Sequence, residues 1–177
     1  MAEAATQQTP TEALIATLDL PQGGWSDAAR KDALSRLQQA GLPERRDEYW
    51  KYTRPDTLTQ PQAVSAAVRA SEDVALFDQI DRLKLVFVDG VFDADASDDL
   101  ALEGITIERL AQANADLHWA RDLYGTLEKN GQTPVARPLA ALNTAFAADG
   151  VLIHVTDKVS KPVNIVYRRT SETADVM

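Results

Sequence analysis

The residue types that usually carry catalysis or bind metals are sparse in this sequence of 177 residues. It contains no cysteine and two histidines, His118 and His154. No disulfide, iron–sulfur cluster or zinc–thiolate site can therefore be built from this chain alone, and two histidines are too few for a multi-histidine metal site. Neither histidine has a cysteine partner or a local serine-nucleophile motif, so we interpret both as structural or surface residues.

An acidic run could in principle bind calcium: Asp93, Asp95, Asp98, Asp99 and Glu103. An EF-hand loop that begins at Asp93 needs glycine at its sixth position and glutamate at its twelfth. Those positions hold Asp98 and Gly104. The pattern fails, and we predict a solvated loop.

Basic and aromatic side chains alternate in a dense segment: Arg45, Arg46, Tyr49, Trp50, Lys51, Tyr52 and Arg54. Aromatic residues between basic ones can stack nucleic-acid bases. Here, however, Glu44, Asp47 and Glu48 offset most of the positive charge. We therefore favour a short packed helix with Trp50 in the core and the charges outside.

Composition excludes several function classes. The formal net charge is −9, which disfavours non-specific nucleic-acid binding and anionic membrane surfaces. No apolar run approaches the ~18 residues that a membrane span needs. The sequence holds no Walker A, G-x-G-x-x-G, G-x-S-x-G or H-E-x-x-H motif. We expect a cytoplasmic protein that is not an enzyme.

Hydrophobic spacing and turn residues predict an α+β fold. Apolar residues recur at helical spacing after Ser26, a good N-cap, and stop before Gly41, so we predict a helix between them. We expect further helices at 11–20 and 117–124, and one that begins at Pro138.

Residues that favour strands form a second group. Asp89-Gly90 between Leu85–Val88 and Val91–Phe92 predicts a hairpin with a type I′ turn. Strands are expected at 151–156 and 163–168, with a short strand or a helix start near Ile105. Since the sequence stops at Met177 with nothing to cover this sheet, we expect it to be cut inside a β domain.

Three stretches resemble the SufD family, whose members are subunits of the SUF iron–sulfur cluster assembly scaffold. Residues 41–53 resemble its signature G-L-P-x-x-[KR]-x-E-x-W-[KR]-Y-T. Residues 85–90 resemble its L-V-F-V-D-G hairpin, and 138–150 its entry into the core domain. The related SufB subunit usually lacks the signature that residues 41–53 resemble. We interpret the matching signature residues as structural: Gly41, Pro43, Glu48, Trp50, Lys51, Tyr52 and Thr53.

The resemblance implies an N-terminal helical domain followed by a right-handed parallel β-helix. Residues 1–137 would form the mainly helical domain, with the hairpin near 84–93. Residues 138–177 would hold the entry helix and the first strands of a truncated β-helix. The family's cysteine and histidine residues implicated in cluster assembly lie beyond this sequence, so no catalytic, cofactor-binding or metal residue is assigned.

The resemblance also implies a non-catalytic scaffold that acts with a SufB-like subunit and a SufC-like ATPase. The iron–sulfur cluster would sit transiently on the full complex, and a homodimer is a further possibility. Two other classes stay open: a β-helix enzyme acting on polysaccharides, and a free-standing adaptor module. An enzyme needs catalytic groups clustered on successive coils. The predicted strands and their connection offer few: His154, Lys158, Lys161 and Arg168.

Overall fold

The computed structural model describes residues 8–61, 76–113, 115, 117–127 and 135–172. The chain divides into two compact units that interleave along the sequence. The helical unit comprises Met1–Val64 and Ala115–Ala147, and the strand unit comprises Ser65–Asn114 and Ala148–Asp175. Helices and small sheets are both present, so the predicted α+β class is confirmed. The division into 1–137 and 138–177 stays a prediction.

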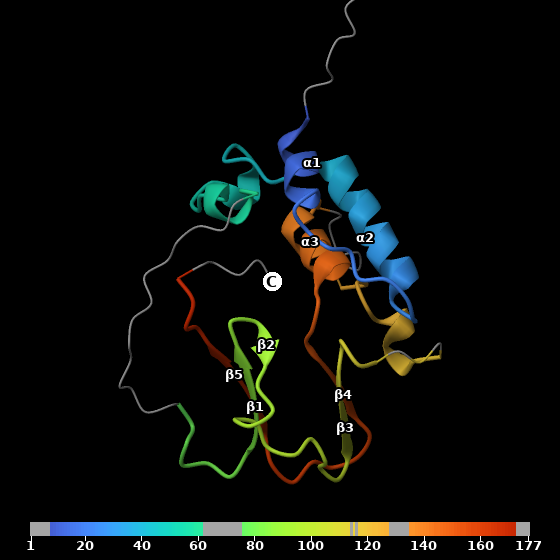
Figure 1. Ribbon diagram of the computed structural model, residues 1–177, viewed down its shortest axis with the longest axis vertical. Coiled ribbons are helices and arrows are strands. Elements are labelled where there is room, and N and C mark those ends of the chain that lie inside the picture. Colours follow the sequence, from blue (N-terminus) through green and yellow to red (C-terminus); the bar gives the residue numbers. More distant parts are fainter. Residues whose placement is uncertain (1–7, 62–75, 114, 116, 128–134, 173–177) are drawn as a thin grey trace, which may run out of the picture. The chain divides into compact units, whose positions relative to one another are not determined.

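The helical unit contains three α-helices: α1 (Pro10–Ile15), α2 (Asp27–Ala40) and α3 (Pro138–Phe146). Figure 1 shows α2 running alongside both α1 and α3. Three short 3₁₀ helices accompany them: η1 (Glu48–Trp50), η2 (Asp56–Leu58) and η3 (Trp119–Asp122). Buried residues from all three α-helices form one cluster: Leu14, Leu37, Ala141 and Leu142. The unit is therefore held together by apolar packing between segments that are far apart in the sequence.

The predicted ends of α2 are confirmed. The helix begins directly after Ser26 and ends before Gly41, whose φ of 72° is the left-handed conformation that glycine adopts without a Cβ clash. The Ser26 side chain does not cap the helix, however. Its Oγ instead accepts a hydrogen bond from Nε of the buried Arg30 at 3.1 Å.

Two helices are shorter than predicted. The helix expected at 11–20 ends at Ile15, because Thr17 and Leu18 donate to carbonyls three residues back and so leave the α-helical pattern. The helix expected at 117–124 is reduced to η3. Its N-cap, His118, accepts the Ala120 N–H at 3.1 Å and thereby starts the element after Leu117.

The strand unit contains the predicted hairpin. β1 (Leu83–Val88) pairs antiparallel with β2 (Val91–Phe92), and Val88 lies opposite Val91. The two turn residues Asp89 and Gly90 have φ of 47° and 83°, the positive values that a type I′ turn requires. This prediction is confirmed in register and in turn type.

The later strands are also confirmed, and they pair with different partners. β5 (Val163–Arg168) runs parallel to β1, so that β1 lies between β2 and β5 (Figure 1). β4 (Val151–Val155) runs antiparallel to β3 (Ile105–Arg109), which settles the ambiguity near Ile105 as a strand. Buried Leu83, Leu85 and Ile107 form the core of this unit.

None of the helices in the described part of the chain is long and apolar enough to cross a membrane.

Candidate functional site

The family-like signature, residues 41–53, belongs to the helical unit and makes an exposed excursion between two buried prolines. Pro43 and Pro55 are both buried, and the residues between them are exposed except for the half-buried Trp50. The start of the segment is anchored because the Leu42 N–H donates to Thr11 Oγ1 at 3.1 Å. Leu42 also packs against the Leu14 and Leu37 core. The signature is therefore an excursion with fixed ends.

Short-range hydrogen bonds shape the excursion. The Glu44 N–H donates to the Asp47 carboxylate at 2.9 Å, and the Asp47 N–H returns to the Glu44 carbonyl at 3.0 Å. The Trp50 N–H then donates to the Asp47 carbonyl at 2.9 Å, which closes η1. Asp47 thus organises the turn locally through its carboxylate and its backbone.

The two tyrosine side chains of this excursion face solvent. Tyr49 is 71% exposed and Tyr52 is 91% exposed, with Lys51 Nζ lying 5.4 Å from the centre of the Tyr52 ring. The prediction that Trp50 lies in the core is wrong, because Trp50 is only half-buried and η1 buries no residue. A single 3₁₀ turn between prolines is too short to present an amphipathic face to the core.

The aromatic residue that does anchor the helical unit is Trp25, which is 5% exposed. Its ring stacks on His118 at 4.7 Å between centroids, and Tyr124 meets it edge-on at 5.4 Å. Periodicity did not identify Trp25, because it precedes its helix rather than lying within it.

Buried Arg30 joins this cluster to α3. Its Nη1 donates to the Ala145 carbonyl at 2.9 Å, and its guanidinium lies 5.5 Å from the centre of the Tyr124 ring. The Tyr124 hydroxyl donates to the Thr144 carbonyl at 2.8 Å. The hydrogen bonds and ring contacts account for a buried arginine in a helical core.

The two histidines lie in different environments. His118 caps η3 and stacks on Trp25, which agrees with its interpretation as a structural residue. His154 lies exposed on β4 opposite Thr106 of β3.

The acidic residues at 93–103 form a loop whose carboxylates bind backbone N–H groups. Asp93 Oδ1 accepts from Ala96, Asp98 Oδ2 accepts from Lys84 at 2.7 Å, and Asp99 Oδ1 accepts from Ala101. The loop is thus tied to β1. Among the described residues, no group of three or more His, Asp and Glu side chains is arranged to hold a metal ion.

A polar anchor in the strand unit was not predicted. Arg109 and Asp149 form an ion pair, and the Asp149 Oδ1 also accepts the N–H groups of Ala111 and Gly150. The Arg109 guanidinium lies 4.7 Å from the centre of the Phe92 ring. The pairing of Arg109 with Asp149 was not predicted from the sequence, because a partner 40 residues away leaves no local signal.

Comparison with known proteins gives two agreeing findings. The family described as "SufBD protein N-terminal region" matches residues 22–165. The iron–sulfur cluster assembly protein SufD of Escherichia coli (strain K12) is 31% identical over 152 residues, which cover 77% of this chain and 33% of that protein. The chain therefore spans about a third of the length of this relative.

The matched range contains the signature segment, the hairpin and α3, the same three stretches that resembled the SufD family in the sequence. The family match spans far more than half of the chain, and the relative agrees with it. We conclude that the chain belongs to the SufBD family and carries a SufD-like N-terminal region.

Proposed function

We propose that this chain is the N-terminal part of a non-catalytic scaffold subunit that serves iron–sulfur cluster assembly together with a SufB-like subunit and a SufC-like ATPase. The family match over residues 22–165 carries this proposal, and the identity to a SufD protein supports it. A homodimer is a second assembly open to such a subunit.

The chain itself supplies structure rather than cluster ligands. It has no cysteine, so thiolate ligation of iron must come from residues outside these 177. The cluster is therefore the cargo of the whole complex and is not a resident cofactor of this region.

The strand unit is proposed to lead into a parallel β-helix. The parallel register of β5 on β1, from Leu83 opposite Val163 to Val88 opposite Arg168, is the type of pairing that stacked coils use. The antiparallel pairing of β4 with β3 would then belong to the boundary that precedes the coils.

The deciding experiment uses the full-length protein co-expressed with its SufB-like and SufC-like subunits. We expect all three to co-purify at fixed stoichiometry and to yield iron–sulfur absorbance after anaerobic reconstitution. Residues 1–177 alone, treated identically, should yield none. Failure of the three subunits to associate, or stoichiometric cluster absorbance on residues 1–177, would contradict the proposal.

A further inference from the structure

A groove of about 540 Å³ opens beside β3 in the strand unit. Two runs of consecutive residues line it, Leu100–Glu103 and Ile105–Ile107. Successive side chains of a strand point to opposite faces, so a groove that touches three consecutive residues of β3 lies along the edge of the strand, where the backbone is. Because β4 occupies one edge of β3, the groove follows the other edge.

The pairing of β3 with β4 decides which backbone groups face this groove. The Leu110 N–H donates to the Gly150 carbonyl, and the Gly104 carbonyl accepts the Thr156 N–H, both at 2.9 Å. In an antiparallel pair, residues that bond to the partner strand alternate with residues whose N–H and C=O point away from it. Ile107 lies an odd number of residues from both Gly104 and Leu110, so its N–H and C=O point away from β4.

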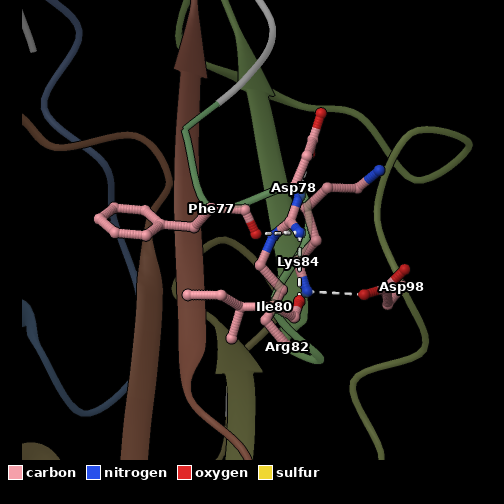
Figure 2. A network of polar contacts seen from close by, with 6 residues as sticks. All are labelled: Phe77, Asp78, Ile80, Arg82, Lys84 and Asp98. Atoms are coloured by element: carbon pink, nitrogen blue, oxygen red, sulfur yellow. Dashed lines mark hydrogen bonds and ion pairs between the residues drawn. The ribbon is translucent and has the colours of Figure 1, made fainter.

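The acidic loop that precedes β3 covers the neighbouring strand but leaves this edge open. Along β1, the Asp98 N–H donates to the Lys84 carbonyl at 2.8 Å. The Asp98 carboxylate accepts the Lys84 N–H at 2.7 Å, and Figure 2 shows the two residues side by side. At β3 the loop forms a β-bridge, in which the Ile105 N–H donates to the Leu102 carbonyl at 3.4 Å. In the part of the chain that the structure describes, no backbone hydrogen bond closes the N–H or the carbonyl of Ile107.

An open strand edge of this kind binds extended backbone. Its N–H and C=O groups are spaced to match another strand, and edges that are left uncovered recruit one. The groove adds apolar surface, because Leu100, Leu102 and Ile105 pack only partly buried against the core of the unit. The open stretch is short, since the Arg109 carbonyl already accepts two N–H groups from the turn after β3. The occupant that fits is therefore a short extended segment.

The charges around the groove restrict the side chains of that segment. Three exposed carboxylates lie in the groove wall or directly before it: Asp98, Asp99 and Glu103. The basic residue Lys158, near Gly104, is offset by the adjacent Asp157. Arg109 is offset by its ion pair with Asp149. The carboxylates stay in excess even when Lys84 of β1 is counted against them, so a basic segment is the electrostatic complement.

We propose that the free edge of β3 binds an extended segment of a partner protein in which apolar residues alternate with lysine or arginine. The segment adds to β3 as an antiparallel strand. Its apolar side chains extend the face on which Ile105 and Ile107 lie, and its basic side chains meet the surrounding carboxylates. This interaction surface goes beyond the proposed role in cluster assembly, so either proposal can fail without the other.

The test is an NMR titration of the labelled chain with a capped five-residue peptide that alternates lysine and valine. We expect a Kd of about 0.1–1 mM, an ordinary value for so short a peptide. Binding should move the Ile107 amide proton downfield and protect it from exchange with solvent, because it gains an acceptor. The Thr106 and Glu108 amides, which face β4, should keep the protection they already have.

Two modified peptides separate strand addition from simple charge attraction. Residues that exchange hydrogen bonds across an antiparallel pair lie on the same face of the sheet, so the valines are the residues that bond to Ile107. Methylation of the valine backbone nitrogens removes those N–H donors, keeps every charge, and should weaken binding at least tenfold. Glutamate in place of lysine keeps the backbone donors and should also weaken binding at least tenfold, because like charges then meet.

Two variants of the chain test the carboxylates. Glu103→Gln removes one charge from the groove wall and should weaken binding of the lysine peptide about twofold to fivefold. Glu48→Gln removes the same charge from an exposed position of the helical unit and should bind as the unaltered chain does.

Three results would overturn the proposal. The first is a methylated peptide that binds as tightly as the unmodified one, and the second is an Ile107 amide that does not respond to the peptide. The third is an Ile107 amide that shifts with protein concentration before any peptide is added, because a second copy of the chain would then occupy the edge.

Discussion

The carboxylate of Asp89 accepts a hydrogen bond from the backbone N–H of Thr170, 81 residues later in the chain, at 2.8 Å. The Ser171 N–H donates to the same oxygen at 3.0 Å, and the Thr170 hydroxyl donates to the other carboxylate oxygen. Asp89 is also the first turn residue of the β1–β2 hairpin. One side chain thus joins the hairpin turn to the segment that follows β5.

This arrangement predicts a pH dependence in the acid range. The Thr170 hydroxyl bond, followed by the N–H bonds from Ser171 and Thr170, lowers the pKa of Asp89. Because the folded-state pKa is lowered, the stabilisation is complete above the ordinary aspartate pKa of about 3.9 and is lost as pH falls through the folded value. We expect amide-exchange protection at Thr170 and Ser171 to fall in that acid window.

The matched variants for this prediction are Asp89→Asn and Asp95→Asn. Asp89→Asn should reduce exchange protection at the Thr170 and Ser171 amides already at neutral pH. The protection that remains should no longer depend on pH in the acid range. Asp95→Asn alters an exposed carboxylate of the neighbouring loop, and should leave the protection and its pH dependence unchanged at both amides. An unchanged exchange profile in Asp89→Asn would show that the carboxylate does not hold this segment.

Removing one partner of the Arg109–Asp149 ion pair should lower the free energy of unfolding by an amount that depends on which partner is removed. Asp149→Ala leaves a largely buried guanidinium and two backbone N–H groups without their acceptor, and should cost about 3–5 kcal/mol in the free energy of unfolding. Arg109→Met should cost less, because the Asp149 carboxylate keeps both N–H donors. Denaturant unfolding of the two variants, followed by amide exchange on β3 and β4, measures the difference. Equal losses would contradict this assignment.

A side chain at position 104 should destabilise the fold through a steric clash as well as through backbone strain. Its φ is +79°, and a Cβ there would lie 2.7 Å from the Lys158 carbonyl oxygen, which is backbone and cannot turn away. Gly23 has a similar φ of +93° with nothing within 4 Å. Left-handed strain costs each alanine variant roughly 1–2 kcal/mol. Gly104→Ala should lose about 1–3 kcal/mol more through the clash. Denaturant midpoints test this, and similar losses in both variants would exclude the clash.

Two of the three tryptophans, Trp25 and Trp50, predict a contrast. Trp25 is buried in the cluster with His118 and Tyr124, so Trp25→Ala should lower the free energy of unfolding by about 3–5 kcal/mol. Trp50 is half-buried on the signature excursion, so Trp50→Ala should cost less than half as much. Helical circular dichroism during denaturation measures both. A larger loss for Trp50→Ala would restore it as the core anchor.

The elements that local sequence could predict are those with local causes. The hairpin turn follows from Asp89-Gly90 and the end of α2 follows from Gly41, because each depends on φ preferences a few residues long. The start of α2 was predicted at the right residue, but Ser26 does not cap it. The position of Trp50 could not be predicted in this way. Its burial depends on whether the surrounding chain returns to the core, and the prolines on either side hold it in an exposed turn instead.

Contacts between distant segments had no signal in a single sequence. Trp25 with His118 and Arg109 with Asp149 are both combinations of ordinary residue types. The signature segment was recognised as a pattern, but its letters alone did not indicate that Tyr49 and Tyr52 face solvent.

The parallel pairing of β5 on β1 has a consequence for synthesis of the protein. The hairpin is complete at Phe92, yet the strand that covers the other edge of β1 ends only at Arg168. At ordinary translation rates the ribosome needs roughly 4–15 s to make that difference. During this interval the apolar β1 edge is open to other nascent chains. A slow, non-local closure of this kind favours assistance by chaperones over spontaneous folding at high expression.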